Sequence, residues 1–436
     1  MAFSDFVRRS GFWFVDYLKG GNVRKHYEDI SNLFNNPALV EKHQVHQFNE
    51  LAKYATENTV FYQKYRGCTA LQDFPIIDKN TIKAFNADFQ SPLAIAKNSI
   101  KMHTSGSTGT PMVVIQDKNK RDRVYAEMMY LWGLSGYKIG MRYMFLRRWN
   151  NINKKSSLTA YARNLIMQDV EHLDENTLSA IAKRLSSDKH IKMIIGYAST
   201  LNMLADYLDK NNYHPGDFSI KTILSGSEVL TEKTRSTLKK VFGCNVVSLY
   251  SNQENGMLAI ECNSNKEFHL NNASYIFEVL KIDKDEPADA GELGRIVVTD
   301  LYNYAMPLIH YDTGDLTIRK ERSECNMQGE VVERIEGRKV DVVFDTSGKA
   351  LSPHTITNGL WRFDQLRQFQ LIQKSRCRYE LTVNDPDDAY SDEEMIATCK
   401  EFFGKDAKIL IKRVSDIPVL ASGKFRYIIC ENSGDE

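Results

Sequence analysis

The spacing of hydrophobic residues changes along the chain and predicts regions of different structure. Residues 1–90 read mainly as helices. Within them, Phe48, Leu51 and Tyr54 follow one another at three-residue spacing, which is typical of one apolar helix face. From about 99 to 320, short apolar runs of strand length alternate with helical segments. This alternation predicts parallel α/β layers with ligands at the carboxyl ends of the strands.

The middle region contains three predicted strands and two predicted helices. The strands are the apolar runs at 192–199, 219–226 and 245–251. The helices lie between them, at 200–212 and 231–243. Gly243 closes the second helix, as glycine commonly does.

A smaller unit with a different pattern begins near residue 338. It predicts two strands, a helix and a further strand, at 366–375, 378–385, 391–405 and 407–414. The helix has Ser391 as its N-cap and Gly404 as its stop. Such a unit can bury one face of a small sheet under one helix.

We therefore expect an α/β protein with two domains, which also suits its 436 residues. Residues 1–336 would form a large, multi-layer N-terminal domain with mixed sheets, mainly helical over 1–90. Residues 337–436 would form a small, mobile α+β C-terminal domain that acts as a lid. The segment 331–343 is the predicted hinge.

Composition excludes several classes of protein. The 57 basic and 56 acidic residues give a net charge of +1, so the chain lacks the basic excess of a general nucleic-acid binder. Seven cysteines without a CxxC pair suit a reducing compartment. No run of 18 apolar residues predicts a membrane-spanning helix. We expect a cytoplasmic protein.

The first twenty residues are rich in aromatic side chains and contain three basic ones. Their apolar stretch is closed by Asp16 without a small-residue cleavage site, which argues against a signal peptide. We expect a helix packed on its own domain. Peripheral contact with a membrane surface is the alternative.

The strongest local signal is the segment 104–110. Five of its seven residues carry hydroxyl groups and the other two are glycines. Hydroxyls, exposed amides and close backbone approach suit an anionic phosphate. The segment is not the common P-loop, because the lysine of that motif is absent. A solvated turn is the alternative interpretation.

Four further segments follow it in order. Glu254 comes just after the predicted strand 245–251, and Asp315 follows the apolar run 307–310, so both are expected at strand ends. Arg338 opens the predicted hinge, and Lys424 lies near the end of the small unit. Each segment alone is weak evidence.

Together these segments resemble the adenylate-forming superfamily of acyl-CoA synthetases, nonribosomal-peptide adenylation domains and luciferases. TSGSTGTP resembles the phosphate loop, YSNQE the Tyr-to-Glu motif, YDTGD the ribose motif and ASGKFR the C-terminal lysine motif. NTVFYQKY, DFPIIDK, LSGSEVLT and YAMPLIHYDTGDL resemble the phenylacetate–CoA ligase-like branch, which includes capsular polysaccharide biosynthesis ligases. The resemblance covers about residues 45–430.

The resemblance implies a role for each matching residue. The phosphate loop would consist of Thr104, Ser105, Gly106, Ser107, Thr108 and Gly109. Tyr250 would lie against the adenine beside Gly226, Ser227 and Glu228, and Asp315 and Arg338 would bind the ribose. Glu254 would hold Mg²⁺. Lys424 would bring a positive charge to the reacting carboxylate and α-phosphate, so Lys424, Glu254 and Thr108 are the expected catalytic residues.

Three departures from the resemblance stand out. Val340 occupies a hinge position where many relatives carry an acidic residue, and His310 stands where close relatives often have arginine. Cys262, His269 and Cys325 match a zinc site of some relatives, but one partner is missing and the spacing is loose. We expect buried apolar cysteines there rather than zinc.

The resemblance implies an ATP-dependent ligase that makes an acyl-adenylate from a small carboxylic acid. Its acceptor would be coenzyme A, a carrier phosphopantetheine, or an amine or hydroxyl of a sugar, in polysaccharide or envelope assembly. The alternatives are a non-catalytic nucleotide- or acyl-binding module and an adenylyltransferase whose product keeps AMP. Residues near 143–149, 196–199 and 225–227 would line the acid pocket, where Arg147, Arg148 and Trp149 either contact an anionic acid or lie on the surface.

Overall fold

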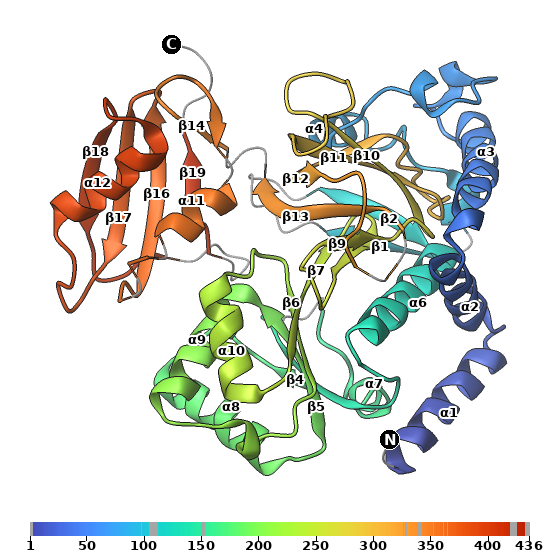
Figure 1. Ribbon diagram of the computed structural model, residues 1–436. Helices are drawn as coiled ribbons and strands as arrows, with labels where there is room; N and C mark the ends of the chain where they lie inside the picture. Colours follow the sequence, from blue (N-terminus) through green and yellow to red (C-terminus); the bar gives the residue numbers. More distant parts are fainter. Residues whose placement is uncertain are drawn as a thin grey trace.

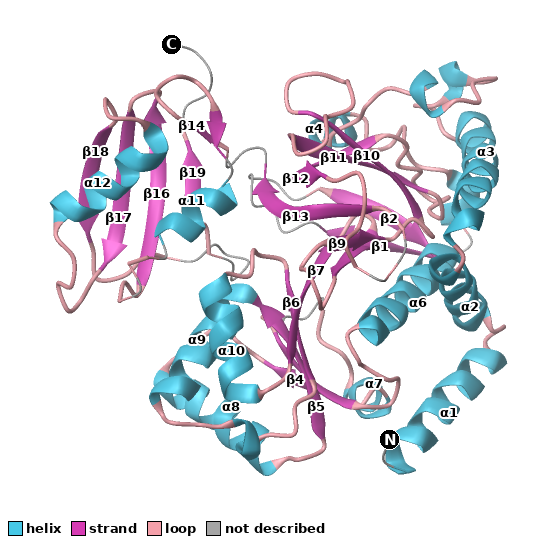
Figure 2. Cartoon of the chain, in the orientation of Figure 1, coloured by secondary structure: helices cyan, strands magenta, loops and turns pink. Residues whose placement is uncertain are grey.

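A computed structural model shows two units, a large one built on an 11-stranded sheet and a small one built on a 4-stranded sheet (Figures 1 and 2). The structure describes residues 3–96, 98–103, 112–149, 153–325, 327, 329–338, 342–351, 353–360, 362–363, 365–418 and 425–431. This arrangement confirms the expected α/β class with a large mixed-sheet part and a small α+β part. The exact division between residues 336 and 337 stays a prediction, and the last strand of the large sheet runs on to Arg338.

Helices make up most of the first 90 residues, as their apolar spacing predicts. They are α1 (Phe3–Leu18), α2 (Asn22–Asn35), α3 (Val40–Asn58) and the short α4 (Lys79–Ala84). The apolar face of α3 buries Phe48, Leu51 and Ala55 in one core. α5 (Pro92–Ile95) follows, and the hairpin of β1 (Ser99–His103) and β2 (Val113–Asp117) comes next.

One half of the large sheet is parallel. It contains β3 (Arg142–Leu146), β4 (Leu165–Gln168), β5 (Ile191–Tyr197), β6 (Thr222–Gly226) and β7 (Asn245–Asn252). Helices α8 (Glu175–Ser187), α9 (Ala198–Lys210) and α10 (Glu232–Phe242) pack together beside it (Figure 1). Gly243 ends α10 with φ of 63°, a left-handed conformation that glycine adopts without strain. The predicted strands and helices of this region are confirmed.

The other half of the large sheet is antiparallel, so the expectation of parallel layers up to residue 320 is wrong there. Its strands are β8 (Gly256–Glu261), β9 (Phe268–Leu270), β10 (Tyr275–Lys281), β11 (Leu293–Asp300), β12 (Tyr311–Arg319) and β13 (Val331–Arg338). No helix crosses between successive strands here, which is why antiparallel pairing is possible. Asp315 consequently lies inside β12 and not at a strand end.

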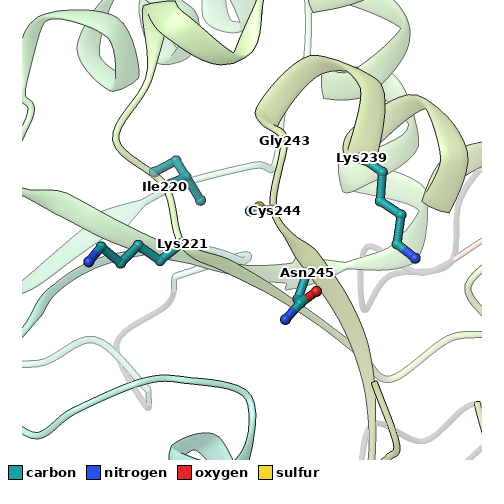
Figure 3. A pocket seen from close by; sticks show the side chains of 6 residues that line it. All are labelled: Ile220, Lys221, Lys239, Gly243, Cys244 and Asn245. Carbon is teal, nitrogen blue, oxygen red and sulfur yellow. The ribbon is translucent and has the colours of Figure 1, made fainter. Parts of the chain in front are cut away.

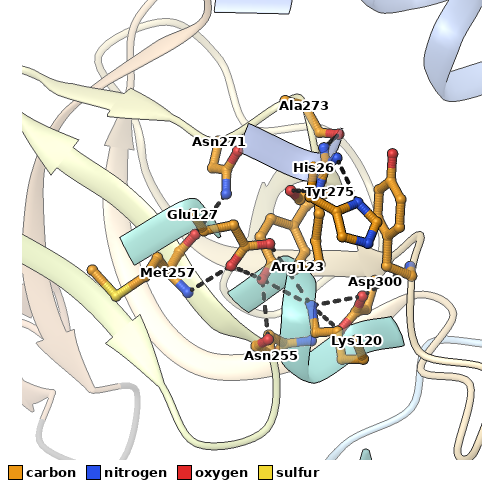
Figure 4. A network of polar contacts seen from close by, with 12 residues as sticks. His26, Lys120, Arg123, Glu127, Asn255, Met257, Asn271, Ala273, Tyr275 and Asp300 are labelled. Atoms are coloured by element: carbon orange, nitrogen blue, oxygen red, sulfur yellow. Dashed lines mark hydrogen bonds and ion pairs between the residues drawn. The ribbon is translucent and has the colours of Figure 1, made fainter. Parts of the chain in front are cut away.

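A buried polar network ties α6 (Lys118–Leu134) to the antiparallel half (Figure 4). The Nζ of Lys120 lies 2.8 Å from Asp300 Oδ2 and 3.0 Å from the hydroxyl of Tyr275. Arg123 donates to Ser274 Oγ over 2.9 Å and contacts Asp29 of α2. Because charges buried in this way need partners, the network fixes how α2, α6 and the sheet meet.

The small unit contains β16 (Gln368–Ser375), β17 (Arg378–Asn384), α12 (Asp392–Phe403) and β18 (Lys408–Arg413), as predicted. Ser391 caps α12 by accepting from the amide of Glu394 over 3.2 Å. Three features were not predicted: the β14 (Val343–Phe344) and β15 (Ala350–Leu351) pair, α11 (Pro353–Leu360), and β19 (Ile428–Cys430), which pairs with β16 in parallel. α11 contacts β13 of the large unit. Among the described helices, none is long and apolar enough to span a membrane.

Candidate active site

Two neighbouring parallel strands bring five of the predicted residues to one sheet edge. Gly226 ends β6, and Ser227 and Glu228 follow it. Tyr250 lies near the end of the adjacent strand β7, and Glu254 lies in the turn after it. Ser227 has φ of 70°, which a residue with a side chain adopts only where its surroundings enforce it. The carboxyl ends of parallel strands are where α/β sheets bind ligands.

Tyr250, Asp315 and Arg338 come together although they lie on different strands. The hydroxyl of Tyr250 donates to Asp315 Oδ2 over 2.8 Å, and Arg338 Nε lies 3.8 Å from Asp315 Oδ1. Arg338 is the register partner of Asp315 across β12 and β13. Three strands separate β7 from β12 in the sheet, so the sheet must curl for the phenol to reach the carboxylate. Burial raises the pKa of Asp315, and the charges of Arg338 and Lys79 oppose that rise.

Glu254 is buried and held by two groups that sequence reasoning did not assign. Lys79 Nζ, at the start of α4, lies 3.2 Å from Glu254 Oε1, and the hydroxyl of Tyr311 donates to the same oxygen over 3.2 Å. The side chain of Gln116 in β2 donates to the backbone oxygen of Glu254 over 2.9 Å. Lys79 belongs to the segment DFPIIDK, but nothing in its spacing from residue 254 pointed to this contact.

Glu228 connects the large unit to the end of the chain. Its Oε2 accepts from the amide of Ser199 at the start of α9 over 2.8 Å. Its Oε1 accepts from the amide of Phe425 over 3.1 Å. Phe425 directly follows Lys424 in the sequence, so the segment after the predicted lysine reaches the predicted site.

Part of the predicted site lies outside the described residues. This part is the phosphate loop (Thr104, Ser105, Gly106, Ser107, Thr108 and Gly109), Lys424 and, at the hinge, Val340. The flanks of the loop are described: His103 at the end of β1 pairs with Val113 at the start of β2. The roles assigned to these residues stay predictions.

The described part of the predicted acid pocket is divided between core and surface. Tyr143 is buried in the core beside Trp132, with ring centroids 5.7 Å apart. Arg148 lies 2.5 Å from Glu171, and the two side chains are 36% and 44% exposed, which suits the surface interpretation. Arg147 lies over the rings of Phe145 and Trp149, each 5.3 Å away. An interior role for Arg148 therefore has no support in this geometry.

Cys262, His269 and Cys325 form a cluster that their loose spacing did not predict. One possible ligand atom from each lies within 4.8 Å of the others, and His269 Nε2 is 2.9 Å from Cys325 Sγ. Cys325 is half-buried against His269, and Cys262 contacts Ser264 Oγ at 3.0 Å, so both thiols meet polar groups and the expectation of buried apolar cysteines is wrong. These donors suit zinc, but a structural zinc site has four ligands and the described residues supply three.

A separate hollow of about 570 Å³ lies at the amino ends of β6 and β7 (Figure 3). Its lining includes Lys221, Lys239 and Cys244. The predicted residues stand at the opposite ends of the same strands, so this hollow is not part of the candidate site.

The chain is similar in sequence to known proteins. Residues 343–431 match the family described as the CapK C-terminal domain. Phenylacetate-coenzyme A ligase of Pseudomonas putida is 22% identical over 77% of this chain and 79% of its own length. The enzyme of the same name from Thermus thermophilus is 26% identical over 69% of this chain and 70% of its own length.

The fold is also that of a solved ligase. 2-Hydroxyisobutyryl-CoA ligase in the postadenylation state, in complex with 2-HIB-AMP, superposes with a TM-score of 0.71 at 16% identity, over 89% of this chain and 88% of that chain. The same ligase in the thioesterification state gives 0.57 over 90% of each chain. The chain is thus a distant homologue of the phenylacetate–coenzyme A ligases, with the fold of the adenylate-forming superfamily and a CapK C-terminal domain.

Proposed function

We propose that the protein is an AMP-forming ligase that activates a carboxylic acid with ATP and passes the acyl group to an acceptor. One observation carries this proposal: the amide of Phe425 bonds to Glu228, 3.1 Å away, at the sheet edge that also holds Tyr250 and Glu254. A module that only binds nucleotide would not need the end of its chain at that edge. A ligase needs it there, because Lys424 would have to reach the reacting groups.

The nucleotide would lie along the residues at this edge. Asp315 has two carboxylate oxygens and can accept from both ribose hydroxyls, and Arg338 adds a donor beside it. The phenol of Tyr250 orients Asp315, while its ring and residues 226–228 face the base. These roles rest on the geometry of the described residues together with the family motifs.

The triphosphate is where negative charge accumulates. Thr108 and the rest of the phosphate loop would supply amide and hydroxyl donors to it. Glu254 is the protein ligand that would hold Mg²⁺, a hard cation that takes carboxylate and phosphate oxygens and offsets their charge. Lys79 lies beside Glu254, so it both orients that carboxylate and adds a cation. Preorganised cations of this kind stabilise the charge that develops when pyrophosphate leaves.

The acceptor is proposed as the thiol of coenzyme A or of a carrier phosphopantetheine, with an amine or hydroxyl of a sugar as the second candidate. The relatives' names support the first, and the match to the CapK C-terminal domain supports work in polysaccharide or cell-envelope assembly. After adenylation, the small unit would turn about residues 338–341 and so present its other face to the acceptor.

Pyrophosphate release tests the proposal. The protein is offered ATP, Mg²⁺ and a panel of carboxylic acids, then coenzyme A or an amino sugar, and the products are identified by mass. We expect acid-dependent pyrophosphate, free AMP and an acylated acceptor. Retained AMP on the product would instead identify an adenylyltransferase. Nucleotide binding without pyrophosphate from any acid would identify a non-catalytic module.

A further inference from the structure

The first helix of the chain exposes several large apolar side chains, although Phe12 and Trp13 of the same helix pack against the core. The side chains of Phe6, Phe14, Tyr17 and Leu18 are between 58% and 75% exposed. At 3.6 residues per turn these positions fall within about 120° of one another, on one side of the helix. An ordinary surface helix buries such a stripe against the core. Here the four side chains stay more exposed than buried.

The opposite side of α1 is firmly seated on the protein. Asp16 is buried and accepts from the amides of Val23 and Arg24 at the start of α2. The ring of Phe12 contacts that of Tyr125, with centroids 5.7 Å apart. A Cβ on Gly140 would clash with the backbone oxygen of Asp5, so the helix backbone lies directly on that glycine. The outward apolar face is therefore a consequence of specific contacts on the inward face.

A second helix, α7 (Ser157–Ala162), lies beside α1 in Figure 1 and also exposes apolar side chains. Arg8 joins the two helices, because its Nη1 donates to the backbone oxygen of Tyr161 and its guanidinium lies 4.6 Å from that ring centroid. Leu158 and Tyr161 of α7 are 78% and 70% exposed. Two adjacent helices thus each expose large apolar side chains, and we call the exposed residues of these two helices the α1–α7 surface.

This surface is also basic. Residues 4–25 and 153–163 contain eight lysines and arginines against two aspartates, in a chain whose net charge is +1. The remainder of the chain is accordingly net negative. Arg9, Lys19, Lys154 and Lys155 are exposed and belong to these two segments. Exposed aromatic and aliphatic groups rimmed by cations are typical of helices that lie in the interface of an anionic bilayer.

We propose that the α1–α7 surface docks the protein on an anionic lipid surface. The apolar side chains would enter the headgroup boundary while the basic rim contacts the phosphates. A second copy fits less well, because a two-fold contact would oppose the same basic rim to itself. The proposal does not depend on the ligase activity.

Co-sedimentation of the full chain with lipid vesicles tests the proposed docking. We expect binding to vesicles of phosphatidylcholine mixed equally with phosphatidylglycerol to be at least about tenfold stronger than to phosphatidylcholine alone, and to weaken in high salt. The double variant Phe14→Ser/Tyr17→Ser should lose roughly tenfold or more in partitioning. Lys154→Glu/Lys155→Glu should remove the preference for the anionic lipid.

Matched variants elsewhere on the surface serve as controls. Val60→Ser/Leu410→Ser changes two apolar side chains that are 67% and 61% exposed, and Lys210→Glu/Lys405→Glu reverses two exposed lysines. Both should bind vesicles like the unaltered protein, and all variants should keep its unfolding midpoint. Equal loss in test and control variants, or no vesicle binding by the unaltered protein, overturns the proposal. So does a dimer in solution, measured by sedimentation velocity, that Phe14→Ser/Tyr17→Ser dissociates.

Discussion

At the scale of single residues, the candidate site pairs each acidic group with a proton donor or a cation. Asp315 has Tyr250 and Arg338, and Glu254 has Lys79 and Tyr311. A site that must bind a polyanion gains from cations that are already in place, because none has to be recruited as charge develops. The pairs also keep the buried carboxylates satisfied before any nucleotide arrives.

Replacing Lys424 should separate the two half-reactions. Lys424→Ala should lower acyl-adenylate formation by roughly 10²- to 10³-fold, a typical loss for one charge-stabilising group. Transfer from pre-made acyl-adenylate should be affected far less, because its α-phosphate has already reacted. Pyrophosphate release and acyl transfer are measured separately. The exposed Lys405 gives the control variant Lys405→Ala, which should leave both half-reactions unchanged. If Lys424→Ala slowed both half-reactions equally, the proposed role of Lys424 in adenylation would be contradicted.

Lys79→Met tests the residue that sequence reasoning missed. The substitution removes a cation 3.2 Å from Glu254 Oε1 but keeps a side chain of similar length. We expect kcat/KM for ATP to fall roughly tenfold or more, with KM for the acid little changed. Initial rates at varied concentrations of ATP and of the acid measure these constants. Lys83→Met, at an exposed position of the same helix, should behave like the unaltered protein.

At the scale of elements, buried polar groups decide how helices meet the sheet. Lys120 of α6 and Asp300 of β11 are both fully buried, and His310, just before β12, links the segment near Phe74 to Glu278 of β10. Such contacts add little net stability when complete, but each is costly to break.

Lys120→Met should therefore destabilise strongly. It leaves Asp300 buried without its cation, which costs about 3–5 kcal/mol. The midpoint of urea unfolding, followed by circular dichroism, should fall accordingly. Lys118→Met breaks the exposed pair with Asp122 on the same helix and should cost less than about 1 kcal/mol. Similar losses in the two variants would show that the buried pair is not what holds α6.

His310 should make stability depend on pH. Its Nδ1 must donate to the Phe74 carbonyl, 3.0 Å away, and its Nε2 lies 2.7 Å from Glu278 Oε2, so only the protonated ring brings a positive charge to that carboxylate. Burial lowers the pKa of His310, but the hydrogen bond and charge of Glu278 outweigh burial and raise it overall. A raised pKa contributes stability below the unfolded value of about 6.5, and this contribution disappears as pH rises through the folded value.

The difference in unfolding free energy between the protein and His310→Gln should thus be largest at about pH 6 and shrink toward about pH 9. Urea unfolding across that range measures it. The exposed His190 provides the control His190→Gln, whose difference should stay flat. A difference that grows with pH would mean that the neutral ring is the stabilising form.

At the scale of the whole molecule, the amide of Phe425 bonds to Glu228 across the two units. Glu228→Ala should speed hydrogen exchange of residues 425–431 roughly tenfold, because a lost hydrogen bond to a charged group is worth about 1.5–3 kcal/mol. Mass spectrometry of peptic fragments measures this. Exchange in β16 should not change, and acceleration there as well would mean that the small unit itself had loosened.

Much of the site followed from sequence because its residues stand beside local structural signals. Glu254 follows an apolar run, and Arg338 and Asp315 lie in Gly-containing motifs, so local order and motif resemblance were enough to single them out. Lys79 and Glu254 are 175 positions apart, and no local pattern joins them. No local pattern predicts β19 either, because its three residues form a strand only by pairing with the edge of β16.

Spacing and capping act over a few neighbouring positions, so sequence alone was enough to predict most of the helices, three strands of the parallel half and the motif residues. Which distant groups meet depends on how the whole chain packs. The curl of the large sheet brings Tyr250 to Asp315 across three intervening strands. Tertiary packing also sets which face of α1 is buried, because that face is the one in contact with Gly140 and Tyr125 and is not set by the pattern of the helix itself. Contacts between remote segments are set by packing the whole chain, which local periodicity does not encode.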